Sequence, residues 1–264
     1  MQLPIFQIDA FTSRVFGGNP AAVVPLESWL PDSVLQSIAA ENNLAETAFF
    51  VPRSAQGTDY ELRWFTPKVE VDLCGHATLA TAHLLFTRIV PEAKKVRFTT
   101  QSGWLSVSRE GGRLALDFPS RPPAPCSAAE ALRLENALGV QPAAVLAARD
   151  YFVVLRSADA VRNLSPDLVQ VAALDRFAVI VTAPGDDCDF VSRFFAPAQG
   201  IAEDPVTGSA HCTLIPYWSR RLGKISLLGR QLSARGGELF CEDLGERVSI
   251  AGHAVLYMEG SIFI

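Results

Sequence analysis

Short apolar runs bounded by turn residues recur along the whole chain, with a few longer helical stretches between them. Two of these runs flank Glu110, Gly111 and Gly112, which predicts a hairpin turn. Short strands mixed with helices in this way predict an α+β protein. The runs predicted as strands are residues 5–11, 21–25, 48–51, 60–65, 96–100, 104–108, 114–118, 152–155, 177–182, 190–195, 225–234 and 248–250, and a last apolar run, 254–264, could pair with a sheet in either half.

Three stretches have the apolar spacing of helices. The first opens at Pro31 and Asp32 and ends near residues 42–43. The second, residues 75–89, is apolar almost all round, which places it inside a core rather than on its surface. The third, residues 128–138, is stopped by Gly139.

A proline-rich segment divides the chain. Four prolines lie between residues 119 and 125, and we predict a stiff connector there that cannot form a strand. The length of 264 residues suits one large or two modest domains. We therefore expect an N-terminal α+β domain at 1–120, which could also take up the last strand, and a C-terminal α+β domain at 121–264.

The two halves of the chain resemble each other in one stretch. RWFTP at 63–67 is echoed by RFFAP at 193–197, and GHA at 75–77 by GSA at 208–210. In each half a strand and this turn are followed by a loop with acidic residues and a Gly-polar-Ala start to an apolar helix. A repeat of this length predicts a duplicated domain.

Composition and charge narrow the class of protein. With 49% hydrophobic and 19% charged residues, the chain is expected to fold around a core. The net charge of −5, without basic blocks, argues against nucleic acid as a partner. The start lacks the basic segment of a signal peptide, and no apolar run reaches membrane-spanning length. Five cysteines without a repeated CxxC favour neither a disulfide framework nor a zinc ribbon, so we expect a cytoplasmic protein.

The repeated Gly-polar start predicts a pair of anion sites. A helix N-terminus presents unsatisfied N–H groups at the positive end of the helix dipole, and Gly75 and Gly208 would let a carboxylate or phosphate approach them. Two such sites, one in each domain, would face each other across an interdomain cleft, where small molecules commonly bind. The alternative is that both glycines only permit close packing of the helices.

Several polar residues near these helix starts could carry proton chemistry. Glu46 directly precedes an apolar strand, where partial desolvation suits a carboxyl to general acid or base catalysis. His76 could donate to a substrate oxygen, and Asp204 could either contact substrate or cap the second helix. Each of these residues also has an ordinary structural interpretation, and Asn19 is by default a turn residue.

Other chemistries lack their motifs. The chain has no G-x-S-x-G elbow, no P-loop and no G-x-G-x-x-G after a strand, so neither an α/β-hydrolase nor a nucleotide cofactor is indicated. His211 and Cys212 are adjacent, which is not the spacing of metal ligands, and core packing is the better interpretation. Cys74 is by default a small buried residue, with a thiol base as the alternative.

Longer motifs resemble one known family. They are FGGNPAAV at 16–23, NLAETAF at 43–49, RWFTP at 63–67 with LCGHAT at 73–78, EDPVTGSAH at 203–211 and RGGEL at 235–239. In content and order they resemble the phenazine biosynthesis PhzF-like family of isomerases. The resemblance implies the diaminopimelate epimerase-type fold, in which two similar α+β domains each wrap a curved sheet around a central helix. It also implies an active site in the cleft between the domains and a homodimer.

The resemblance implies roles for individual residues. Glu46 matches the catalytic acid/base that removes a proton from the substrate and returns it elsewhere on the same face. No metal, flavin, pyridoxal phosphate or nucleotide is implied, and the expected partner is a small carboxylate substrate, not a nucleic acid or a membrane. The remaining matches are His76 and Asp204 in the catalytic site, and Asn19, Gly75, Gly208 and Ser209 as substrate-binding residues, the two glycines through backbone N–H groups.

One departure distinguishes two mechanisms. Racemases of the wider superfamily use two opposed cysteines, each three residues before the helix-opening glycine, where this chain has Asp72 and Pro205. A single carboxylate is therefore favoured over an amino-acid racemase or epimerase that uses Cys74. A catalytically silent binding protein on the same scaffold is a third hypothesis, since fold does not fix function. No motif encodes the substrate, and the loop at 184–189 is the candidate for specificity.

Overall fold

The computed structural model describes residues 1–53 and 57–264. The chain forms two compact units, here called unit 1 (Met1–Asp117 with Ala251–Ile264) and unit 2 (Phe118–Ile250). The last strand, β18 (Ala254–Phe263), belongs to unit 1 because it pairs antiparallel with β1 (Gln2–Ala10) along its whole length.

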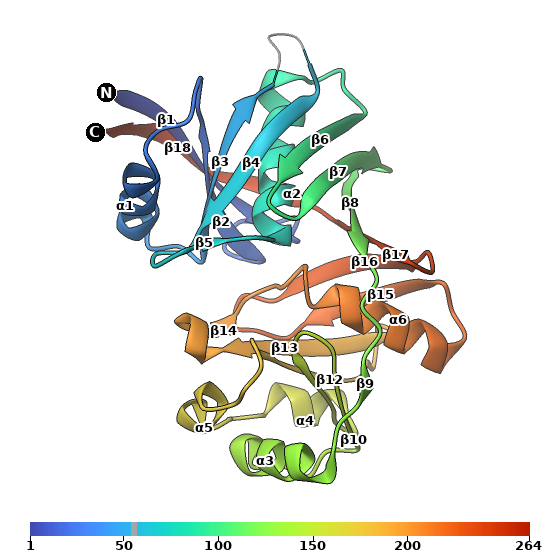
Figure 1. Ribbon diagram of the computed structural model, residues 1–264. Helices are drawn as coiled ribbons and strands as arrows, with labels where there is room; N and C mark the ends of the chain where they lie inside the picture. Colours follow the sequence, from blue (N-terminus) through green and yellow to red (C-terminus); the bar gives the residue numbers. More distant parts are fainter. Residues whose placement is uncertain (54–56) are drawn as a thin grey trace. The chain divides into compact units, whose positions relative to one another are not determined.

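Unit 1 is built on one mixed sheet, in the order β18-β1-β2-β3-β4-β6-β7-β8 (Figure 1). Neighbours are antiparallel except β2/β3 and β4/β6, which are parallel and therefore need crossover connections. The β7–β8 turn holds Gly111 and Gly112, both at positive φ, as the hairpin prediction requires. The further strands of this unit are β2 (Asn19–Pro25), β3 (Glu46–Pro52), β4 (Asp59–Phe65), β5 (Glu70–Val71), β6 (Lys95–Thr100), β7 (Gly103–Glu110) and β8 (Arg113–Pro119).

Two helices make the crossovers of unit 1. α1 (Asp32–Asn42) joins β2 to β3 and packs Leu35 and Ile38 into a core with Phe49 and Phe65. α2 (Gly75–Leu84) joins β5 to β6, continues into a π-helical turn (Leu85–Ile89), and is buried on nearly every side. It packs against β1, β2 and β3, which confirms the prediction of an apolar helix inside a core.

Unit 2 repeats this plan, in the sheet order β9-β10-β11-β12-β13-β15-β16. Again two neighbouring pairs are parallel, β11/β12 and β13/β15, and helices cross between them. The strands are β9 (Ala124–Pro125), β10 (Ala144–Ala147), β11 (Tyr151–Val154), β12 (Val179–Pro184), β13 (Phe190–Ala196), β14 (Ile201–Asp204), β15 (Ser226–Gln231), β16 (Gly237–Asp243) and β17 (Arg247–Gly252).

The proline-rich connector departs from its prediction at both ends, because Pro119 is the last residue of β8 and a further short strand follows at 124–125. Ala124 and Pro125 form the short strand β9, paired with β10, although this segment was expected to exclude strands. The pairing is tolerated because proline lacks only a donor, and at an edge strand the missing N–H breaks no bond inside the sheet.

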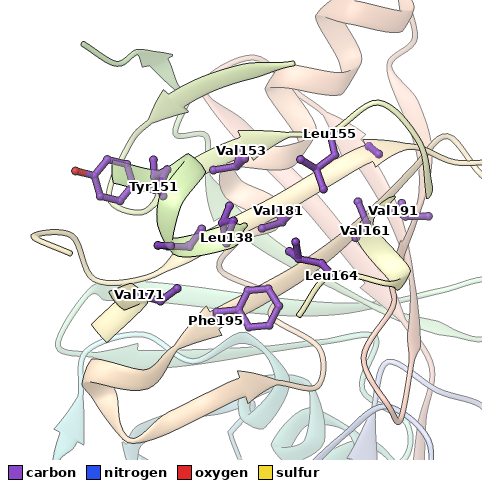
Figure 2. Packing of buried hydrophobic residues seen from close by; sticks show 14 of the residues in the cluster. Leu138, Tyr151, Val153, Leu155, Val161, Leu164, Val171, Val181, Val191 and Phe195 are labelled. Carbon is purple, nitrogen blue, oxygen red and sulfur yellow. The ribbon is translucent and has the colours of Figure 1, made fainter. Parts of the chain in front are cut away.

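The helices of unit 2 enclose its core. α3 (Ala128–Leu138) starts at a capping box formed by Ser127 and Glu130 and ends at Gly139, as predicted. α4 (Ala158–Arg162) and α5 (Leu168–Ala172) make the β11–β12 crossover and pack Val161 and Val171 against the sheet (Figure 2). No helix in the described part of the chain is long and apolar enough to cross a membrane.

The second buried helix starts later than the repeat suggests. α6 (His211–Leu222) begins three residues after Gly208, and Gly208–Ala210 form a tight turn in which the His211 N–H donates to the Gly208 carbonyl. Pro216 lies inside the helix and cannot donate to the Cys212 carbonyl. The backbone N–H of Arg121 donates to that oxygen instead, at 2.8 Å, so the carbonyl remains satisfied.

The repeated RxFxP segment has the same structural role in both units. Arg63 of β4 binds Glu70 through two nitrogens, both at 2.7 Å, and Arg193 of β13 binds Glu203 in the same way at 2.7 and 2.8 Å. Each guanidinium also lies over the phenylalanine ring two residues later, 5.1 and 4.9 Å from its centroid. The duplicated arginine therefore ties each central strand to the short strand that precedes the buried helix.

Candidate active site

The parallel pairing of β2 and β3 brings three polar residues of unit 1 together. Asn19 begins β2, Glu46 begins β3, and His76 is the second residue of α2. Because parallel strands start at the same edge of a sheet and α2 packs on both, the start of each element meets the other two. Residues predicted from separate motifs thus share one site, with Gly75 at the start of α2.

The imidazole of His76 is the centre of this cluster. Its Nε2 lies 3.3 Å from Oε2 of Glu46. Its Nδ1 lies 3.2 Å from Nδ2 of Asn19 and 3.5 Å from Sγ of Cys74. Asn19, His76 and Cys74 are buried, whereas the Glu46 side chain keeps 13% of its surface exposed, although its Oε2 is buried.

Burial decides the charge of His76. Removal of the ring from water lowers its pKa to about 3, far below the ordinary value of a histidine. The ring is therefore neutral at physiological pH, and its approach to Glu46 is the contact of a neutral imidazole with a carboxylate and not an ion pair.

The same cluster contains three possible metal ligands. Glu46, Cys74 and His76 each offer a donor atom, and these atoms lie within 4.8 Å of one another. The thiol lies 3.5 Å from Nδ1 and a carboxylate oxygen lies 3.3 Å from Nε2, so the two groups contact different nitrogens of the ring. A zinc ion would need the donors to converge on one point about 2.0–2.3 Å from each. The contacts of Cys74 and Glu46 use both ring nitrogens of His76, whereas a single ion would bind only one of them.

In unit 2, Asp204 is held in the turn that precedes α6. One carboxylate oxygen accepts from the Thr207 hydroxyl at 2.5 Å, and the side chain is buried. Gln231 of β15 braces this turn: its amide oxygen accepts from the Thr207 N–H at 2.8 Å, and its amide nitrogen donates to the Asp204 carbonyl at 2.8 Å. Asp204 is thus a fixed carboxylate next to Gly208, and Gln231 is a supporting residue that the sequence analysis missed.

Ser209 has a cationic neighbour. Nη2 of Arg149 lies 3.4 Å from the Ser209 hydroxyl. The guanidinium is fixed by buried Asp150 at 3.1 Å and by the ring of Phe177, 4.5 Å from its centroid. Arg149 keeps 28% of its side chain exposed and was not a predicted site residue. The repeat indicates its position, because Arg149 is the counterpart of Asn19. Asn19 begins β2 and contacts the residue after Gly75, and in the same way Arg149 precedes β11 and contacts the residue after Gly208.

Two other predictions can be compared with the structure of unit 2. His211 and Cys212 are fully buried, and the His211 Nδ1–H donates to the Thr207 carbonyl at 2.9 Å. Burial lowers the pKa of His211 to about 4 and raises the pKa of Cys212 to about 11. This confirms core packing for both residues.

Of the predicted site residues, the structure groups Asn19, Glu46, Gly75 and His76 in unit 1, and Asp204, Gly208 and Ser209 in unit 2.

The loop at 184–189 lies at the other end of β13 from Asp204, and its role in specificity stays a prediction. It closes the β12–β13 hairpin where Pro184 pairs with Phe190, whereas Asp204 pairs with Phe194, four residues further along β13. At roughly 3.3 Å per residue the separation along the strand is about 13 Å. Asp189 also anchors the loop, since its carboxylate accepts from the Leu228 N–H of β15 at 2.7 Å.

Comparison with known proteins agrees with this architecture. A family model described as phenazine biosynthesis-like protein matches residues 8–260. An uncharacterized isomerase of Pseudomonas aeruginosa is 55% identical over 263 residues, which cover 99% of each chain. A crystal structure of a PhzF-family phenazine biosynthesis protein from Enterococcus faecalis has a TM-score of 0.93 and 47% identity over 100% of both chains.

A more distant structure extends the likeness of fold. A predicted epimerase from Pseudomonas aeruginosa has a TM-score of 0.78 over 99% of both chains at 20% identity, which concerns the fold alone. Together with the duplicated plan of the two units, these likenesses confirm the predicted α+β fold of the diaminopimelate epimerase type, a sheet around a buried helix in each of two similar domains.

Proposed function

Because the chain belongs to the phenazine biosynthesis-like protein family, we propose that it is a cofactor-independent isomerase of a small carboxylate substrate, with Glu46 as its acid/base. The observation that carries the proposal is the contact between Glu46 and His76. A partly exposed carboxylate lies 3.3 Å from a buried, neutral imidazole, which can orient it without neutralising it.

The proposed reaction moves one proton. An oxygen of Glu46 takes a proton from a carbon conjugated with the substrate carboxylate, and the electron pair of that C–H bond passes into the conjugated system. The Glu46 carboxyl group then returns the proton to a second carbon of the system, and the double bond shifts. The substrate is neither oxidised nor reduced overall, and Glu46 ends the cycle as a carboxylate.

The negative charge that builds on the substrate needs donors. Backbone N–H groups at Gly75 and Gly208 are the proposed partners of the substrate carboxylate, as the family resemblance implies. Arg149 supports an anionic substrate, because a partly exposed guanidinium at the Ser209 hydroxyl favours a carboxylate over a neutral group. Asp204 is proposed to contact a polar group of the substrate.

Deuterium incorporation from D₂O tests this function. The purified protein would be incubated with a panel of small amino, hydroxy and unsaturated carboxylic acids, and mass and double-bond position would be followed by mass spectrometry and NMR. We expect an isomerised product from at least one unsaturated acid, with deuterium where the proton exchanges with solvent. Neither product nor exchange across the panel would count against the proposal and in favour of a silent scaffold.

A further inference from the structure

The two ring nitrogens of His76 have different surroundings. Nδ1 faces the amide nitrogen of Asn19 at 3.2 Å and the thiol of Cys74 at 3.5 Å, whereas Nε2 faces the carboxylate of Glu46 at 3.3 Å. A neutral imidazole carries one proton, on one nitrogen or the other. Which nitrogen carries it determines whether His76 donates to Glu46 or presents a lone pair to it.

The Asn19 amide determines the position of this proton. An amide nitrogen only donates, so Nδ1 must accept, and the single proton of the neutral ring then resides on Nε2. Nε2, which then carries the proton, lies 3.3 Å from an oxygen of Glu46, and a carboxylate only accepts. This tautomer sets a donor against an acceptor at each ring nitrogen, whereas the alternative tautomer would place two donors at Nδ1 and two acceptors at Nε2.

We propose that Asn19 is a positioning residue that fixes His76 as the Nε2–H tautomer and thereby keeps the protonated ring nitrogen next to the Glu46 carboxylate. Its catalytic consequence depends on the proposed function, whereas the tautomer itself does not. Asn19 acts here through His76, in contrast to the contact with substrate expected from the family resemblance.

The other groups around His76 are compatible with this tautomer. The Cys74 thiol, at 3.5 Å, is a weak donor and also favours an accepting Nδ1. Asp9 of β1, a buried carboxylate on a strand that packs against α2, accepts from the Phe16 N–H at 2.9 Å. Glu46 and Cys74 are therefore the titratable groups that face the ring directly, among the contacts described.

Nitrogen NMR of histidine-labelled protein tests the proposal directly. The chain has four histidines, and the His76 signals are identified by their loss in His76→Asn. We expect the wild-type ring to be a neutral Nε2–H tautomer that does not titrate between about pH 5 and pH 8. A wild-type spectrum with the proton on Nδ1, or with a mixture of tautomers, would overturn the proposal without any variant.

Asn19→Asp is the sharpest variant because it keeps the shape and replaces the donor by an acceptor. Nδ1 then needs a proton of its own, and a ring between two carboxylates becomes an imidazolium, so the pKa of His76 should rise from about 3 to above neutrality. Asn42→Asp is the matched control: Asn42 lies in α1, donates to the Thr47 hydroxyl at 3.1 Å, and its replacement should leave the His76 signals unchanged. If Asn19→Asp does not fold, Asn19→Ala should instead show a mixture of tautomers.

Activity separates this proposal from the proposed function. Loss of an orienting partner typically costs about 10- to 100-fold, and we expect Asn19→Asp to lose this in kcat with little change in KM. An unaltered His76 signal in a folded Asn19→Asp protein would reject the role of Asn19 even if the wild type isomerises its substrate. Conversely, the expected spectra with no isomerisation by the wild type would reject the proposed function and leave the tautomer assignment standing.

Discussion

Glu46→Gln is the perturbation that bears most directly on the proposed mechanism. Glutamine keeps the length of the side chain, and its carbonyl oxygen can occupy the place where Oε2 now lies 3.3 Å from Nε2 of His76. It cannot take up a proton from a carbon acid. The variant therefore removes the chemistry and leaves the neighbouring contacts in place.

The expected loss of activity and the expected loss of stability both follow from the geometry. A positioned general base contributes about 10²- to 10⁴-fold, which at about 1.4 kcal/mol per tenfold is roughly 3–5 kcal/mol of transition-state stabilisation. The cost in folding is smaller. A hydrogen bond to a charged acceptor contributes about 1 kcal/mol more stability than one to a neutral acceptor. Part of this loss is offset because the neutral amide avoids the desolvation cost of a carboxylate whose side chain is only 13% exposed. A change in Tm of about 2–4 °C is the most we expect.

The assay compares the wild type, Glu46→Gln and Glu41→Gln under the same conditions. Glu41 is exposed near the end of α1, so its variant makes the same change of charge away from His76. Initial rates of deuterium incorporation and of product formation would be measured by mass spectrometry, and folding by thermal melting. We expect Glu41→Gln to match the wild type and Glu46→Gln to be at least about 10²-fold slower.

A folded Glu46→Gln protein that retains turnover within about tenfold of the wild type would refute the mechanism, because one proton-transferring group could not be missing at so small a cost. If turnover fell equally in Glu41→Gln, the loss would reflect net charge and not Glu46.

Three further predictions test the surroundings of the site. Arg149→Gln should raise KM for a carboxylate substrate about 10- to 100-fold, in keeping with one lost charged hydrogen bond. The control Arg220→Gln changes an exposed residue near the far end of α6 and should leave KM unchanged. Equal KM values for the two variants would contradict the prediction. Cys74→Ala should keep turnover within about tenfold, and its inactivation would favour the thiol racemase. Burial lowers the pKa of His76 to about 3 and of His211 to about 4, so the unfolded chain binds protons that the folded chain excludes. The free energy of unfolding, measured with denaturant, should then fall from about pH 6.5 towards pH 5 by up to about 1.4 kcal/mol per pH unit for each histidine, and a flat profile would contradict this.

The apolar pattern located most strands but missed those with little buried surface. β10 has only four residues, and a single one, Ala147, is buried. β16 alternates as a strand should, yet only Leu239 and Cys241 face the core, between glutamates and a glycine. Such strands are specified by their neighbours: β16 exists because β15 offers it six paired positions. A pattern of hydrophobicity cannot report a partner that lies elsewhere in the chain.

The same limit applies to the site. Motifs identified Glu46, His76 and Asp204, because they lie beside turns and helix starts whose glycines and prolines are visible in the sequence. Gln231 reaches Thr207 across 24 residues, and it does so because β13 and β15 pair in parallel with Ser192 opposite Gln231. That register is a property of the assembled sheet. No local pattern distinguishes Gln231 from any other glutamine on a strand.

The duplicated plan gives a physical reason for the different polar residues in the two units. The arginine–glutamate tie is the same in both, whereas the residue that contacts the polar residue after the repeated glycine is neutral Asn19 in unit 1 and cationic Arg149 in unit 2. An arginine at Asn19 would pair with Glu46 and stabilise its ionised form, which weakens it as a base. A neutral amide fixes His76 without that penalty. Beside Ser209 no base is proposed, so a cation there can favour an anionic substrate without suppressing proton transfer.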